Sequence, residues 1–95
     1  MIKVLIERRI ADGLEEHYEN YVSEALKSIS SIPGYISGES LINTDQPNHH
    51  VIISSWHSTN AWEKWATSEK RKYFKDQIMP LLIDEEKYTV FDPQH

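Results

Sequence analysis

The chain has 95 residues, 39% of them hydrophobic and 26% charged, and its formal net charge is −5. These values are typical of one small globular domain, so we expect a single domain over residues 1–95. The negative charge argues against nucleic-acid binding, and the absence of cysteine excludes disulfides, thiolate metal sites and a cysteine nucleophile. Because no apolar stretch is long enough to span a bilayer and the N-terminus lacks the order of a signal peptide, we expect no membrane partner and a cytoplasmic location.

The first third of the chain predicts a strand followed by a helix. Residues 1–10 alternate between apolar and other side chains, which indicates a strand with two differently used faces. Residues 12–29 then carry apolar side chains at helical spacing. Asp12 and Glu15 have the spacing of a capping box at the start of this helix, and the Pro-Gly pair at 33–34 ends it.

The rest of the chain predicts two strands, a helix in two segments and a short last strand. In chain order these are strands over 35–42 and 51–56, helical segments after residue 58 and over 69–79, and a strand over 88–91. Ser58 or Thr59 caps the helix, and Ser68 interrupts it or caps its second segment. The order βαββαβ predicts a ferredoxin-like α+β fold, with an antiparallel four-stranded sheet and helices on one face.

The face of the sheet without helices is expected to be apolar. The run Val51–Ile53 places apolar side chains on both faces, and Leu5 lies on the uncovered one. The second strand adds one of two pairs to that face, either Tyr35 and Leu41 or Ile36 and Ile42. Exposing such a surface forgoes a few kcal/mol of apolar burial at ~25 cal/mol per Å², so we predict a face-to-face homodimer.

Three stretches, PGYISGESL, VIISSWHSTNAWEKWATSEKRKYF and KYTVFDP, carry a resemblance to a known family. Their order and spacing resemble the antibiotic biosynthesis monooxygenase (ABM) family, whose members form dimeric α/β barrels. The resemblance implies a cofactor-independent monooxygenase acting on a small aromatic or quinol-like substrate. Because the family mixes several activities, the alternative is a non-catalytic dimer that binds a small molecule or is associated with stress.

The haem-degrading members of that family have a pattern that this chain does not match. Trp65 matches their tryptophan, but no histidine follows it between Thr59 and Phe91 to ligate iron. Glu7 and Arg8 stand where those members have an asparagine. We therefore expect no haem and no other cofactor.

The resemblance and the residue types together suggest a set of site residues. Aromatic walls between the helices and the sheet would come from four side chains: Trp62, Trp65, Tyr73 and Phe74. His57, His17 and Glu39 are candidate proton acceptors, and Asn60 or Arg9 would hold an anion.

Each candidate also has a purely structural interpretation. An aromatic stripe at helical spacing is more often core than binding site, which applies to Trp62 and Trp65, and Trp56 at a strand end is interpreted as packing alone. His17 lies in a polar stretch typical of the surface, and Glu39 has an alternative partner in Arg9 across a dimer.

Neither the histidine pair nor the basic run predicts a ligand. His49 and His50 are adjacent in a strand and point to opposite faces, so both cannot easily bind one ion, and we expect no metal. The basic side chains Lys70, Arg71 and Lys72 are interpreted as the solvated face of a helix.

Overall fold

The structure, a computed structural model, describes residues 1–94 and alternates strands and helices in the predicted order. The elements are β1 (Ile2–Arg9), α1 (Glu15–Ile29), β2 (Tyr35–Ile42), β3 (His49–Trp56), α2 (Thr59–Ala66), α3 (Glu69–Ile78), the short 3-10 helix η1 (Met79–Leu81) and β4 (Lys87–Phe91). The helix after β3 is broken in two, as predicted.

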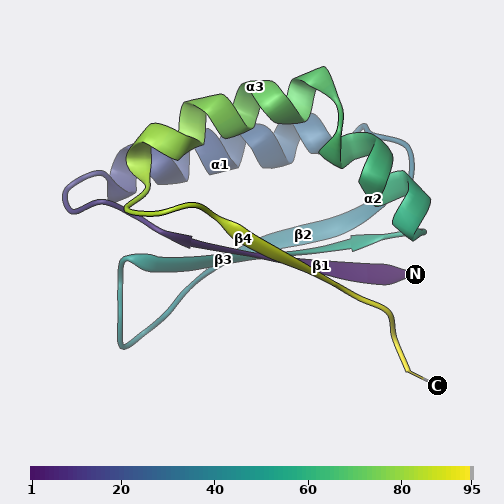
Figure 1. Cartoon of the computed structure of the whole chain (residues 1–95), viewed down its shortest axis with the longest axis horizontal. Coiled ribbons are helices and arrows are strands. Elements are labelled where there is room, and N and C mark those ends of the chain that lie inside the picture. Colours follow the sequence, from purple (N-terminus) through teal and green to yellow (C-terminus); the bar gives the residue numbers. More distant parts are fainter. Residues whose placement is uncertain (95) are drawn as a thin grey trace.

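The four strands form one antiparallel sheet in the order β2-β3-β1-β4, so β1 and β3 are its central strands. All three α-helices lie on the same face of this sheet (Figure 1). The predicted ferredoxin-like α+β class is confirmed. The sheet of one chain is open rather than closed, so the dimeric barrel stays a prediction.

The core lies between the sheet and the helices. In β1 the side chains of Ile2, Val4 and Ile6 are buried, and they alternate with exposed or half-buried neighbours as the pleat of a strand requires. Trp56 is fully buried and donates its indole N–H to the Ser54 hydroxyl at 3.0 Å, which confirms its predicted packing role.

Serine side chains begin both helices that follow β3. The Ser58 hydroxyl accepts the backbone N–H of Ala61 at 3.1 Å, and the Ser68 hydroxyl accepts that of Arg71 at 3.1 Å. Each bond satisfies one of the free donors at a helix N-terminus. The predicted positions of these two helix starts are therefore confirmed.

The predicted capping box at the start of α1 is wrong. The residue that caps this helix is Leu14, without a side-chain hydrogen bond, and the helix begins at Glu15. The Leu14 N–H donates to the Ala11 carbonyl at 3.1 Å, and Gly13 has a φ of 82°. Asp12 therefore lies inside a tight turn rather than at the end of the helix.

The face of the sheet without helices combines an apolar centre with charged side chains. Leu5 pairs with Ile53, and Leu41 pairs with Val51, so these four side chains share this face. Neither predicted pair from β2, Tyr35 with Leu41 or Ile36 with Ile42, lies together on this face. Leu41 is on it, but Tyr35 lies opposite the buried Trp56, because an irregularity between residues 35 and 37 changes the alternation of the strand. The charged side chains on this face are Lys3, Glu7, Arg9, Glu39 and Lys87.

Candidate functional site

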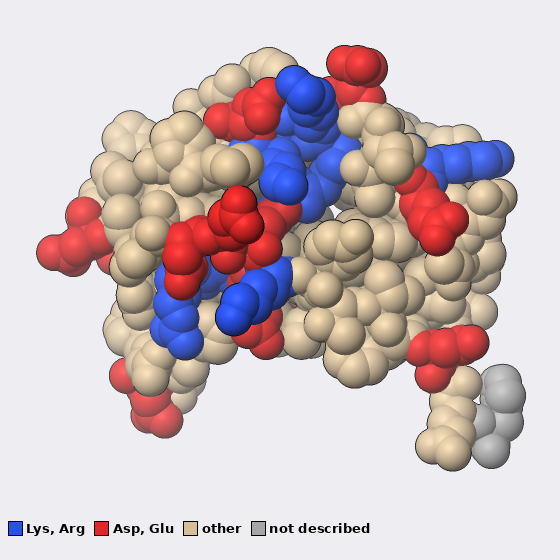
Figure 2. All heavy atoms as spheres, viewed as in Figure 1, with Lys and Arg blue, Asp and Glu red and all other residues tan. Residues whose placement is uncertain are grey.

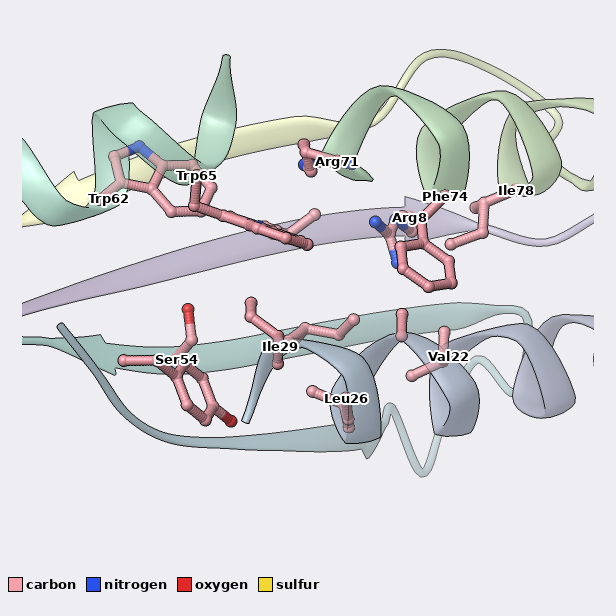
Figure 3. A pocket seen from close by; sticks show the side chains of 14 residues that line it. Arg8, Val22, Leu26, Ile29, Ser54, Trp62, Trp65, Arg71, Phe74 and Ile78 are labelled. Atoms are coloured by element: carbon pink, nitrogen blue, oxygen red, sulfur yellow. The ribbon is translucent and has the colours of Figure 1, made fainter. Parts of the chain in front are cut away.

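A cavity lies between α2 and α3 on one side and α1 and β2 on the other (Figure 3). Its walls are mainly apolar: Val22, Leu26 and Ile29 of α1, Trp62 and Trp65 of α2, and Phe74 and Ile78 of α3. The polar wall residues are Arg8, Tyr35, Ser54 and Arg71. This lining, apolar with a few polar groups, resembles that of small-molecule sites, but such sites have volumes of ~300–1,000 Å³.

The volume of the cavity limits what it holds without rearrangement. It measures about 50 Å³, whereas a cavity that binds benzene has a volume of ~150 Å³. A wider hollow of about 420 Å³ adjoins it where α2 and α3 meet the segment from Glu86 to Tyr88 at the start of β4. Trp62 and Arg71 line both spaces, so they form the partition between them.

Two arginines and one glutamate form a buried charged cluster at this cavity. The Glu86 carboxylate accepts the Arg8 Nε–H at 2.7 Å and an Arg71 Nη2–H at 2.6 Å. The side chains of Arg8, Glu86 and Arg71 are only 4%, 4% and 10% exposed. Buried charges persist only when paired and hydrogen-bonded, so these three groups depend on one another.

The pKa values of this cluster reflect a competition between burial and charge. Burial alone would raise the pKa of Glu86, but the charges of Arg8 and Arg71 outweigh it and hold that pKa below its usual value. Burial raises the pKa of Tyr18, although Arg8 opposes this. Glu86 is therefore an anion and Tyr18 a neutral phenol near neutral pH.

Tyr18 and His50 extend the cluster along the core. Arg8 donates an Nη1–H to the Tyr18 hydroxyl at 3.2 Å, and its Cζ lies 5.7 Å from the centre of the Tyr18 ring. The His50 and Tyr18 rings are nearly perpendicular at a centroid distance of 4.9 Å, and His50 Nε2 is 3.0 Å from the Pro47 carbonyl oxygen. These contacts fix the position of the Arg8 guanidinium.

Local structure explains why the two arginines point inward. Arg8 continues the alternation of β1, so it lies on the same face as Ile6 and the helices. Arg71, Phe74 and Ile78 are separated by three and four positions and share the inner side of α3. Glu86 comes from the connection just before β4.

Three of the predicted aromatic wall residues line this cavity. Trp62 and Trp65 are 3% and 5% exposed, and Phe74 is half-buried beside them. Figure 3 shows Phe74 reaching from α3 toward α1, with Trp62 and Trp65 on the side of α2. Tyr73 does not belong to the wall, because it is 60% exposed on the outer side of α3.

The predicted proton acceptors and anion-binding residues lie outside the cavity. Three of them are exposed to solvent. His57 directly follows β3, His17 lies on the polar side of α1, and Asn60 lies in the first turn of α2. Glu39 and Arg9 point from the opposite face of the sheet. Arg9 donates there to Gln46 Oε1 at 3.0 Å, and no ion pair joins it to Glu39 among residues 1–94.

No group of three or more potential metal ligands occurs within residues 1–94. His49 and His50 lie on opposite faces of β3, as their adjacency predicts. His50 is buried against Tyr18, whereas His49 lies near Glu7 on the face without helices, with 3.8 Å between His49 Nε2 and the carboxylate.

The sequence analysis missed the residues of the charged cluster. Arg71 is the exception in a basic run that is otherwise exposed, so interpreting the whole run as solvated was wrong at this position. The helical spacing from Arg71 to Phe74 and Ile78 was a usable signal, and so was the inward position of Arg8 in the β1 alternation. Nothing in the sequence distinguishes Glu86 from its acidic neighbours Asp84 and Glu85.

These features define a ferredoxin-like α+β protein whose helices and sheet enclose a small cavity. Residues 1–77 match the family described as antibiotic biosynthesis monooxygenase (ABM), and the chain belongs to this family. The family suggested by the sequence is confirmed. No curated protein matches the chain.

Solved structures of low sequence identity share the fold. An antibiotic biosynthesis monooxygenase matches with a TM-score of 0.90 and 16% identity, covering 100% of both chains. A conserved protein from Methanosarcina mazei Go1 matches with a TM-score of 0.92 and 12% identity, covering 98% of this chain and 92% of that one. SnoaB from Streptomyces nogalater, a cofactor-independent oxygenase, matches with a TM-score of 0.87 and 14% identity, covering 99% of this chain and 93% of that one.

Within residues 1–94, no helix is both long and apolar enough to cross a bilayer.

Proposed function

We propose that this chain is a cofactor-independent monooxygenase that oxidises a small aromatic or quinol-like substrate in the cavity between its helices and sheet. Membership of the ABM family and the likeness to SnoaB, a cofactor-independent oxygenase, support the reaction class. The observation that carries the proposal is the combination of aromatic walls with buried arginines in one cavity.

The chemistry requires little from the protein. A phenol loses its proton, and the resulting anion passes an electron to O₂. One oxygen atom then becomes the new carbonyl oxygen of a quinone, and the other leaves as water. The phenol itself supplies the electrons that reduce O₂, so the reaction of phenol and O₂ to quinone and water needs no external reductant. The protein must hold the ring, stabilise the anion and exclude bulk water, which Trp65, Phe74 and the two arginines would do here.

The size of the cavity favours a single ring over a polycyclic substrate. Since a cavity that binds benzene has ~150 Å³ and this one about 50 Å³, we expect even one ring to use part of the adjoining hollow. Trp62 lies between the two spaces, so its rotation would join them.

We also propose that the active form is a homodimer paired through the face of the sheet without helices. The apolar centre made by Leu5, Leu41, Val51 and Ile53 supports this assembly, since covering it removes apolar surface from water. Charged side chains lie in the same rows as this centre, with Glu39 beside Ile53 and Glu7 between Val51 and Lys87, so the proposed interface would contain charged as well as apolar groups. Closing two such sheets would give the dimeric barrel expected from the family resemblance.

Oxygen uptake with a panel of hydroquinones and naphthols tests the proposed reaction. We expect uptake with the wild type and a loss of about tenfold or more in kcat/KM for Trp65→Ala, because the ring loses its main contact. His57→Ala removes an exposed imidazole that lies outside the cavity, so it should match the wild type. Circular dichroism checks that each variant is folded.

Two results would count against the proposed reaction. If no compound in the panel increases oxygen uptake, the chain is not an oxygenase for this class of substrate. If Trp65→Ala is as active as the wild type, the reaction takes place elsewhere.

A second candidate function is the binding of a small molecule without catalysis. The observation that favours it is that no carboxylate or imidazole of residues 1–94 lines the cavity, so no evident general base lies there. Binding of panel compounds without any oxygen uptake would support this function instead.

A further inference from the structure

The charged cluster beside the cavity has an unbalanced charge. Two guanidinium groups share one carboxylate, and the neighbouring Tyr18 phenol is neutral, so the cluster carries a net charge of +1. All of these side chains are buried, where charge acts over longer distances than in water. An anion in the cavity would neutralise the excess.

Both guanidinium groups keep N–H donors that the cluster does not use. Arg8 bonds to Glu86 and Tyr18 through Nε and Nη1, which leaves Nη2 without a partner among residues 1–94. Arg71 bonds to Glu86 through Nη2 alone, which leaves its Nε and Nη1. Arginine N–H groups are good donors to the oxygens of carboxylates and phenolates. Arg8 and Arg71, which both line the cavity, could therefore bind a carboxylate or a phenolate there.

The cavity has no group suited to removing a proton from a neutral ligand. Besides the arginines, its polar wall residues are Ser54 and Tyr35, and burial raises the pKa of Tyr35. Glu86 is unsuited as a base, since both of its carboxylate oxygens already accept bonds from arginines. A ligand that already carries a negative charge needs no such base.

The hollow that adjoins the cavity has more basic than acidic side chains. It is lined by Arg71, Lys72 and Lys75, with Glu69 and Glu86 as its acidic members. Figure 2 shows Lys and Arg side chains gathered over α3, with acidic side chains on both sides of them. In a chain with a net charge of −5, such a local patch attracts anions to one place.

We propose that the cavity selects an aromatic anion, namely a small arenecarboxylate or an ionised phenol, whose oxygens bind the free N–H groups of Arg8 and Arg71. This inference deepens the proposed function and rests on its assignment of the cavity as the substrate site. Glu86 acts as a positioning residue that holds both guanidinium groups in place.

The test compares ligands of one shape and different charge: benzoate, benzyl alcohol and benzylamine. Their affinities are measured with the whole protein by titration calorimetry, with the fluorescence change of the tryptophans as a second readout. We expect benzoate to bind about tenfold or more tightly than benzyl alcohol, and benzylamine to bind weakest.

Two matched variants locate the origin of this preference. Arg71→Gln removes one buried charge and should make benzoate and benzyl alcohol bind about equally. Lys27→Gln removes one charge from the exposed side of α1 and should leave the preference unchanged. If Arg71→Gln does not fold, Arg71→Lys keeps the charge but loses the fork of donors, and it should retain only part of the preference.

The inference is wrong if the wild type binds benzyl alcohol as well as benzoate, if it binds none of the three probes, or if Arg71→Gln keeps the full preference. These outcomes are separate from those of the proposed reaction. Selective benzoate binding without oxygen uptake would support the anion site and reject the oxygenase. Oxygen uptake with neutral compounds, together with no preference for benzoate, would support the oxygenase and reject the anion site.

Discussion

Replacing Glu86 by alanine would remove the carboxylate that both buried arginines share. The Glu86 side chain is 4% exposed and accepts bonds of 2.7 Å from Arg8 and 2.6 Å from Arg71. After the substitution, two guanidinium groups would remain buried without their counter-ion. Removing one partner of a buried ion pair costs ~3–5 kcal/mol, a large part of the ~5–15 kcal/mol that stabilises a small protein.

Urea unfolding followed by tryptophan fluorescence measures this cost. With a slope of ~1.5 kcal/mol per M, a loss of that size lowers the unfolding midpoint by roughly 2–3 M urea. Glu85→Ala is the matched control, because Glu85 is the exposed neighbour and its replacement should change the free energy of unfolding by less than ~0.5 kcal/mol. All proteins are compared at one concentration, since dimerisation would add to the apparent stability.

A loss of less than ~1 kcal/mol for Glu86→Ala, similar to that of Glu85→Ala, would refute this reasoning. It would show that water reaches the arginines and replaces the carboxylate. The cluster would then resemble a surface ion pair, and water would screen the charges of its arginines from a ligand in the cavity.

Three other predictions concern acid stability, a glycine and the assembly. Because the folded-state pKa of Glu86 lies below its ordinary value of 4.5, the unfolded chain binds the proton first, so stability should fall as pH drops below about that value. The melting temperature of Glu86→Gln should depend less on pH in this acidic range than that of the wild type. Equal pH dependence for the two proteins would contradict a lowered pKa of Glu86. Gly34→Ala should destabilise by ~2–3 kcal/mol in urea unfolding, because φ is 89° and the new Cβ would lie 2.4 Å from the Ala61 Cβ. Gly13→Ala, with φ of 82° and open space, should cost only ~1 kcal/mol, and equal losses would exclude the contact as the cause. Leu5→Lys should turn the proposed dimer into a monomer in sedimentation at micromolar concentration, and a wild type that is already a monomer would reject the assembly.

The fold was predictable because its signals are local. Alternation identified β1, apolar spacing identified α1, and Ser58 and Ser68 marked the two helix starts that the structure confirms. The capping box failed because a motif of two residues does not specify the backbone between them. The turn formed by Ala11 to Leu14 uses Gly13 in a left-handed conformation and places Asp12 at its corner.

The candidate site was predictable only in its apolar half. Trp62, Trp65 and Phe74 were found because aromatic side chains at helical spacing point to an interior surface. The charged half was missed because polar residues are expected outside a core, so the inward positions of Arg8 and Arg71 in their elements were not interpreted as burial. Arg71 and Glu86 are 15 positions apart, and Arg8 and Glu86 are 78 apart, so no local pattern joins them.

The pleat of β1 gives two consecutive arginines opposite surroundings. Arg8 is buried beside Glu86 and Tyr18, whereas Arg9 is in solvent on the other face. Inserting or deleting one residue within this strand would exchange the two and would turn Leu5 from the sheet's outer surface toward the helices. The length of β1 is therefore constrained as well as its composition, because a single-residue change in length would alter the surroundings of every residue on one side of the change.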